Sequence, residues 1–170
     1  EECVNNWLMD FNPYQWTTVD VDEGTVWGDY SAVGVSGAFA FNVYDHADGA
    51  TAGVPGLAPH GGNKAAMCIS THTDFAPNDD YLISPQIQLG NSSSIDLWAA
   101  TLDDTWGAEE FYIAVSTTDN LPASFTDVSP LYEPGTSYEN IMFDLGAYDG
   151  QLVYIAIHCV SNDHWVLYID

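Results

Sequence analysis

Apolar residues recur along this 170-residue chain in short runs, and many of the runs alternate apolar with polar positions. Alternation with a period of two places every second side chain on one face of a pleated strand, and helical periodicity is nearly absent. Clusters of Gly, Pro, Asn and Asp separate the runs. The predicted strands are residues 16–21, 37–44, 65–72, 80–89, 94–102, 110–118, 139–145, 152–160 and 165–170. This pattern predicts an all-β fold in which two antiparallel sheets pack face to face.

One connection, residues 45–64, is rich in Gly, Ala and Pro and is longer than a structural loop needs. It predicts a surface loop that either folds over a site or is mobile. No internal repeat or linker divides the sequence, and its length is sufficient for one buried core. We therefore expect residues 1–170 to form a single domain.

The charge of the chain limits its partners. Lys64 is the only Lys or Arg against 25 Asp and Glu, which gives a net charge of −24, although 46% of the residues are hydrophobic and a disordered acidic tail is thereby excluded. Such a surface repels nucleic acid and anionic lipid, and no apolar run reaches the roughly 20 residues of a membrane span. Multivalent cations or salt would relieve the repulsion. We expect a secreted or cell-surface protein of a saline or calcium-bearing exterior, in a marine or halophilic setting.

Three carboxylates crowd next to one glycine in the stretch TTVDVDEGTVWG, residues 17–28. Calcium prefers six to eight hard oxygen ligands, which loops with alternating Asp and a following Gly supply. Asp20 and Asp22 have this spacing, Glu23 can add a bidentate carboxylate, and Gly24 permits a sharp turn. The sequence therefore predicts a calcium site here, and the alternative is a solvated acidic turn.

Other reactive side chains give weaker signals. Cys3, Cys68 and Cys159 are too few for a disulfide scaffold and match no zinc spacing, so they form either buried hydrophobic positions or one bridge of undetermined pairing. No nucleophile and base stand in a recognisable arrangement, and we expect no enzyme. Carboxylate pairs for glycoside hydrolysis stay possible only because 25 acidic residues offer so many pairs.

A tryptophan in a polar loop is the best candidate for ligand contact. Trp106 lies in LDDTWGAEE, residues 102–110, between two predicted strands. An exposed Trp can stack on a sugar ring while Asp103 and Asp104 accept hydrogen bonds from its hydroxyl groups. The alternative is a Trp that folds back onto the edge of the sandwich.

Four stretches form a familiar ordered set: NDDYLISPQIQL (78–89), FYIAVSTTDNLPASFTDV (111–128), FDLGAYDGQLVYIAIH (143–158) and NDHWVLYID (162–170). In this order they resemble the cleaved-adhesin, or choice-of-anchor J, domains of secreted bacterial proteins, as in gingipain-type haemagglutinin/adhesin regions, which are similar in architecture to MAM domains. WTTVDVD likewise resembles the family's opening W-T-T-I-D-A-D-G-D-G, although DVDEG loses one carboxylate step and gains Glu23.

The resemblance implies a jelly-roll β-sandwich that is non-catalytic, stabilised by calcium and carried by a larger extracellular protein. Its expected partners are a glycan or protein surface and the other domains of the parent protein. The chain stops at Asp170, where the family continues with another Asp, so we expect an excised domain.

Three further carboxylates are candidate calcium ligands. The terminal strands of jelly rolls commonly pair, so Asp10 and Asp170, near the two ends of the chain, are expected to approach one ion. Asp163, before the last predicted strand, matches an Asp of the family motif. For each of them the alternative is a turn residue or a solvated strand end.

Overall fold

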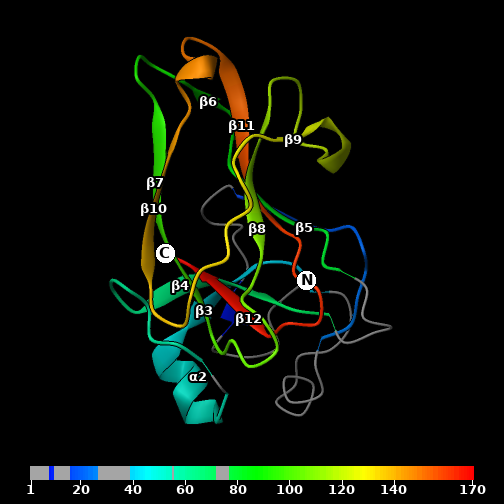
Figure 1. Ribbon diagram of the computed structural model, residues 1–170, viewed down its shortest axis with the longest axis vertical. Coiled ribbons are helices and arrows are strands. Elements are labelled where there is room, and N and C mark those ends of the chain that lie inside the picture. The colour runs from blue at the N-terminus through cyan, green and yellow to red at the C-terminus, as the bar shows by residue number, and fades with distance from the viewer. Residues whose placement is uncertain (1–7, 10–15, 27–38, 55, 72–76) are drawn as a thin grey trace.

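The alternating runs form two antiparallel sheets that pack face to face in the computed structural model (Figure 1). The structure describes residues 8–9, 16–26, 39–54, 56–71 and 77–170. Within these residues, most neighbouring strands are not consecutive in sequence, as expected for the predicted jelly-roll β-sandwich.

Each sheet can be read from one edge to the other. The first sheet has the order β1 (Leu8–Met9), β3 (Asn42–Asp45), β4 (Lys64–Ile69), β12 (Val166–Ile169), β7 (Ser94–Thr101) and β10 (Glu139–Asp144). The second has the order β2 (Thr17–Asp20), β5 (Asp80–Ile83), β11 (Leu152–Cys159), β8 (Phe111–Ser116) and β9 (Thr126–Asp127). β6 (Ile87–Gln88) also pairs with β11, and two short 3-10 helices, η2 (Pro122–Ser124) and η3 (Gly146–Tyr148), lie in connections.

The core lies between the sheets and follows the period-two pattern. Along β11 the odd-numbered side chains Val153, Ile155 and Ile157 turn inward and are buried. The first sheet faces them with inward side chains of β4, β7 and β12, which are Cys68, Leu97, Ala99, Leu167 and Ile169. Burial of alternate apolar positions therefore fixes which face of each strand points into the sandwich.

Two predicted elements differ from the structure. The predicted strand 80–89 is divided into β5 and β6 by residues 84–86, where Pro85 has no N–H to donate to a ladder. The predicted strand 37–44 begins only at Asn42 within the residues that the structure describes. The other strand predictions are confirmed to within two or three residues at their ends.

The prediction of a loop over residues 45–64 is wrong for α2 (His46–Ala52). Local capping explains the helix: the Asp45 carboxylate accepts the N–H groups of Ala47 and Asp48 at 3.2 and 3.3 Å, and Gly53 ends the helix in the left-handed conformation. Beyond α2, the half-buried Leu57 packs with Tyr44 and Tyr168 on the outer face of the first sheet. This segment thus covers a second apolar cluster outside the main core.

Among the helices of the described residues, none has the length and apolar composition of a membrane span.

Replacing Asp45 tests the capping explanation. Asp45→Ala leaves two N–H groups without their acceptor, so we expect a loss of about 1 kcal/mol of unfolding free energy, measured by denaturant titration. Asp45→Asn keeps the acceptor but removes the ion pair with Lys64, which spans 3.6 Å. We expect Asp45→Asn to cost less than Asp45→Ala, since exposed ion pairs contribute little. Equal losses in the two variants would contradict the cap.

Candidate functional site

One end of the sandwich collects connections from both sheets. β2 ends there at Asp20 and β5 begins there at Asp80, and the two residues are direct cross-strand partners. The first sheet contributes the ends of β4 and β7 and the start of β12, because Val166 pairs with Ile69 and Leu167 with Thr101. The described connections that meet at this end are residues 21–26, 70–71, 77–79, 102–110 and 160–165.

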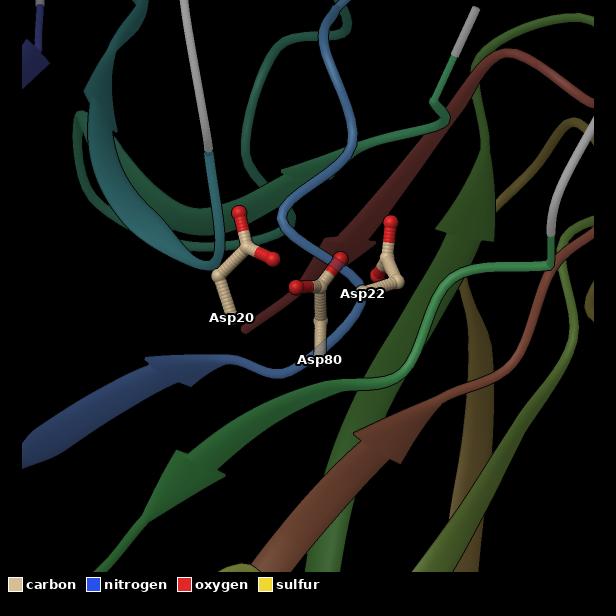
Figure 2. Close-up of side chains that lie close together, drawn as sticks. All are labelled: Asp20, Asp22 and Asp80. Atoms are coloured by element: carbon tan, nitrogen blue, oxygen red, sulfur yellow. The ribbon is translucent and has the colours of Figure 1, made fainter. Parts of the chain in front are cut away.

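Three carboxylates lie together at this end. Asp20, Asp22 and Asp80 each offer an oxygen within 4.8 Å of the others, and Figure 2 shows the three side chains side by side. Asp20 and Asp80 come from paired strands, whereas Asp22 follows the end of β2 by two residues. We call these three residues the carboxylate trio.

Backbone hydrogen bonds orient two members of the trio. Asp22 accepts the N–H of Gly24 at 3.0 Å and that of Asp79 at 2.8 Å, so it joins its own turn to the start of β5. One oxygen of Asp20 accepts the N–H of Glu23 at 2.5 Å. Both carboxylates are therefore held in place before any ligand binds.

Asp80 is the most enclosed member, with 1% of its surface exposed. Its Oδ2 accepts hydrogen bonds from Asn78 Nδ2 at 2.6 Å and from the Cys68 thiol at 3.4 Å. Its Oδ1 is buried and has no hydrogen-bond partner among the described residues. The Oδ2 of Asp20 is also buried and lacks a hydrogen bond of ordinary geometry there, although the Phe39 N–H lies close enough to act on this carboxylate. Burying a carboxylate oxygen without a hydrogen-bond partner raises the free energy of the folded state. We therefore expect the site to hold a proton or a cation.

Burial also raises the pKa values of two members of the trio, Asp80 and Asp20. Burial raises the pKa of Asp80 to about 8; the Asn78 amide opposes the shift, and the charges of Asp20 and Asp22 add to it. Burial also raises the pKa of Asp20; the N–H groups of Glu23 and Phe39 partly oppose the shift, and the Asp22 charge increases it. A divalent cation would reverse these shifts by favouring the ionised carboxylates. Hard oxygen donors of this kind fit calcium.

Gly24 is required by the close approach of its surroundings. A Cβ atom at this position would lie 2.2 Å from Thr71 Oγ1 and 2.3 Å from Asp22 Oδ2. Glu23 precedes it with a left-handed backbone, φ 52°, and its side chain is exposed. The turn thus places Asp22 in the trio, whereas the trio does not include Glu23, whose role as a ligand stays a prediction.

The other predicted ligands lie elsewhere in the described chain or outside it. Asp163 has a left-handed backbone, φ 57°, and a buried Oδ1 without a described hydrogen-bond partner, but it is not part of the trio. Asp170 follows β12, and its carboxylate accepts the N–H of Gly61 at 2.7 Å. Asp10 lies outside the described residues. Metal roles for these three stay predictions.

Asp80 is not among the ligands predicted from the sequence. It stands at the start of the predicted strand 80–89, where a charged residue at an inward position is a signal that it needs a partner. Inward placement becomes visible only when the alternation is followed from Leu82, which lies in the core, back to Asp80.

The predicted binding loop protrudes from the same end. Trp106 is 66% exposed and is not part of any buried cluster of the described residues. The Asp103 carboxylate accepts the N–H of Thr105 at 2.8 Å, and hydrogen bonds from Thr105 lower the pKa of Asp103. Asp104 is exposed and Asp103 is half-buried. The loop therefore presents the Trp106 side chain and the Asp104 carboxylate to solvent.

A buried carboxylate anchors this loop at its base. Glu109 is fully buried and accepts the N–H of Trp165 at 2.5 Å, which connects the loop to the turn before β12. Burial raises the pKa of Glu109 to about 7, and hydrogen bonds from Ser161 and Trp165 partly oppose the shift. At Gly107, φ 121°, a Cβ atom would lie 2.5 Å from His164 Nε2, so the loop and this turn are in close contact.

Comparison with known proteins identifies the family. Residues 9–160 match the profile of the Cleaved Adhesin Domain. The chain belongs to this family. It is 24% identical over 132 residues to Lys-gingipain W83 of Porphyromonas gingivalis, and the match covers 74% of this chain and 6% of that protein. It is also 26% identical over 178 residues to a Hemagglutinin A of P. gingivalis, and this match covers 93% of this chain and 6% of that protein.

Solved structures confirm the fold. The K2 cleaved adhesin domain of Lys-gingipain superposes with a TM-score of 0.66 at 18% identity and covers 92% of this chain and 86% of that one. The K1 domain gives a TM-score of 0.62 at 21% identity and covers 91% and 86%. TmCBM61, solved in complex with beta-1,4-galactotriose, gives 0.56 at 11% identity and covers 95% and 90%. Membership of an adhesin family supports a binding module. The chain spans only 6% of the length of the two relatives given above.

The raised pKa of Asp80 predicts the pH dependence of stability. Folded Asp80 keeps its proton up to about pH 8, whereas a carboxyl of the unfolded chain ionises near pH 4. The folded state then binds more protons in this interval, so the unfolding free energy in EDTA falls as pH rises from about 5 to 8. Glu109 contributes with the same sign up to about pH 7. Melting temperatures across this range measure the slope.

Asp80→Asn is the matched control for this slope, because general repulsion among the acids has the same sign. The variant should melt several degrees higher than the wild type at pH 8 in EDTA and show a flatter dependence between about pH 5 and 8. A slope that is identical in the two proteins would show that Asp80 is ionised in the folded state.

Proposed function

We propose that this chain is a non-catalytic, calcium-stabilised module that attaches a larger secreted protein to glycan surfaces. The observation that carries the proposal is the exposed Trp106, which follows Asp103 and Asp104 by three and two residues on a loop anchored at the end of the sandwich that holds the carboxylate trio. The adhesin family supports a binding role.

Calcium is the ion that suits the trio. Three carboxylates from a turn and two paired strands supply hard oxygens, and one of those oxygens, Asp80 Oδ1, is buried without another partner in the described chain. With a net charge of −24 and a single Lys, few cationic side chains are available to compensate them. The ion would join β2, its turn and β5, and thereby stabilise the loops at this end.

Glycan is the ligand that suits the loop. An indole face stacks on the apolar face of a sugar ring, and flanking carboxylates accept hydrogen bonds from its hydroxyl groups. A fold neighbour, TmCBM61, has been solved with beta-1,4-galactotriose, which shows that a sandwich of this general shape can carry a sugar site. A protein surface is the alternative ligand, and a spacer without any ligand is the alternative function.

The proposed location of the module rests on its net charge and on the proteins that it resembles. The matched segments of Lys-gingipain and Hemagglutinin A are small parts of much longer proteins, which supports other domains of a parent protein as partners. The extreme acidity is best tolerated where calcium or salt is abundant. We therefore place the module outside the cell or on its surface, in a saline setting, away from nucleic acid and without insertion into a membrane.

Calcium should stabilise the folded protein specifically. Binding to the folded state alone adds about 2.7 kcal/mol when calcium stands at 100 times its Kd. EDTA should therefore lower the melting temperature by several degrees, and calcium should restore it where NaCl of equal ionic strength does not. Full replacement of calcium by NaCl would indicate general screening.

The double variant Asp20→Asn/Asp22→Asn should lose most of the calcium response and should melt higher than the wild type in EDTA, because the repulsion disappears with the charges. Asp103→Asn/Asp104→Asn removes the same charge from the exposed loop at the same end and should keep the response. A calcium response that survives in the first variant would remove the trio as the site.

Trp106 should contribute to binding and not to stability. We expect Trp106→Ala to leave the melting temperature within about a degree of the wild type and to weaken glycan binding by about 1–3 kcal/mol, as for an aromatic contact residue. Affinity electrophoresis in β-1,4-galactan and a glycan array measure the binding. Trp106→Phe, which keeps a ring, should retain part of the affinity. Wild-type protein that binds no glycan would contradict the glycan proposal and favour a protein ligand or the spacer function.

A further inference from the structure

Two cysteines from opposite sheets meet in the core beside the carboxylate trio. Cys68 lies on β4 of the first sheet and Cys159 at the end of β11 of the second, with 0% and 1% of their surfaces exposed. Both side chains belong to the apolar cluster between the sheets. Cys3 lies outside the described residues.

The strand register brings the two thiols together. Cys159 is the direct cross-strand partner of Asp80, and such pairs have Cβ atoms about 4.5–5.5 Å apart on one face of a sheet. The Cys68 sulfur approaches from the opposite sheet and lies 3.4 Å from Asp80 Oδ2. Cys68 therefore contacts the residue next to Cys159 on the inner face. Burial raises the pKa of Cys68, and the adjacent Cys159 thiol raises it further.

We propose that Cys68 and Cys159 form a disulfide bond that ties β4 to β11 across the core, and that Cys3 does not take part. The sequence left this pairing open, whereas the structure has Cys68 and Cys159 as free buried thiols that both lie beside Asp80. The proposal does not depend on calcium or on a glycan ligand.

The bond forms by exchange with an external disulfide, such as oxidised glutathione. The thiolate of one cysteine attacks a sulfur of this oxidant, and a mixed disulfide forms while one glutathione thiolate leaves. The thiolate of the second cysteine then attacks the protein sulfur of the mixed disulfide and releases the second glutathione. Two protein thiols are oxidised, one external disulfide is reduced to two thiols, and the two protons pass to the released thiolates.

The exchange takes place during folding, because in the folded protein both thiols are buried and the pKa of Cys68 is raised. Its product fits the surroundings. Asp80 Oδ2 loses the weak S–H donor but keeps the Asn78 amide at 2.6 Å. Cys159 loses only a sulfur–hydroxyl contact with Ser161 at 3.4 Å. The bond would connect positions about 90 residues apart, and constraints on long loops stabilise most.

The single Lys of the chain gives a direct test. Trypsin can cut only after Lys64, so it separates residues 1–64, which contain Cys3, from residues 65–170, which contain Cys68 and Cys159. The protein is refolded with reduced and oxidised glutathione, alkylated in denaturant, digested and weighed by mass spectrometry without reductant. We expect two separate fragments, with one alkyl group on residues 1–64 and none on residues 65–170 until reductant is added.

Two results would overturn the pairing. Fragments that stay joined until reduction would show that Cys3 is bridged to one of the core cysteines. Two alkyl groups on residues 65–170 would show that the core cysteines stay as thiols. As a matched pair, Cys3→Ala should keep the unalkylated 65–170 fragment, whereas Cys68→Ala should expose one alkylatable thiol on it. In the oxidised wild type, added reductant should lower the melting temperature by about 10 °C, and Cys3→Ala should show the same shift.

Discussion

A carboxylate buried between two sheets, in a chain with one Lys and no Arg, is the constraint on which this end of the molecule depends. Asp80 lies on the inner face of β5, where an apolar side chain would otherwise stand. One of its oxygens is held by an amide and a thiol, and the other has no partner in the described chain. Burial of such a group is tolerated only with a proton or a cation, so the ionic state of Asp80 sets the arrangement of its neighbours.

The protein handles its charge with few side-chain cations. Backbone N–H groups orient Asp20 and Asp22, and an N–H group likewise holds Glu109 at the base of the Trp106 loop. On the outer face of the second sheet, the His158 ring lies between the carboxylates of Asp79 and Asp127, at 3.0 and 2.9 Å. Backbone N–H groups and one imidazole thus contact carboxylates that Lys or Arg contact in most proteins.

The two candidate functions of this end are physically connected. The turn that carries Asp22 is bonded to the start of β5, and the loop that carries Trp106 is bonded to the turn before β12. Ser70, just after β4, donates its N–H to Trp165 in that same turn at 2.8 Å. The next residue, Thr71, donates its N–H to the side chain of Asn78 at 3.1 Å, and Asn78 in turn donates to Asp80. An ion in the trio would therefore stiffen the scaffold from which the exposed indole projects, and binding surfaces gain affinity when they are rigid beforehand.

The alternation of apolar and polar residues determined the strands, because a period of two is visible within six residues. The local sequence also indicated that Asp20, Asp22 and Gly24 form a turn that holds carboxylates. The exposed position of Trp106 agrees with its polar surroundings in sequence. Only the tertiary structure decided that Asp80 completes the trio and that Cys68 faces Cys159, since strand register and sheet packing join residues about 60 to 90 positions apart. Helix α2 could not be predicted from the pattern of apolar residues either, because a seven-residue helix depends on its caps and on the sheet beneath it more than on periodicity.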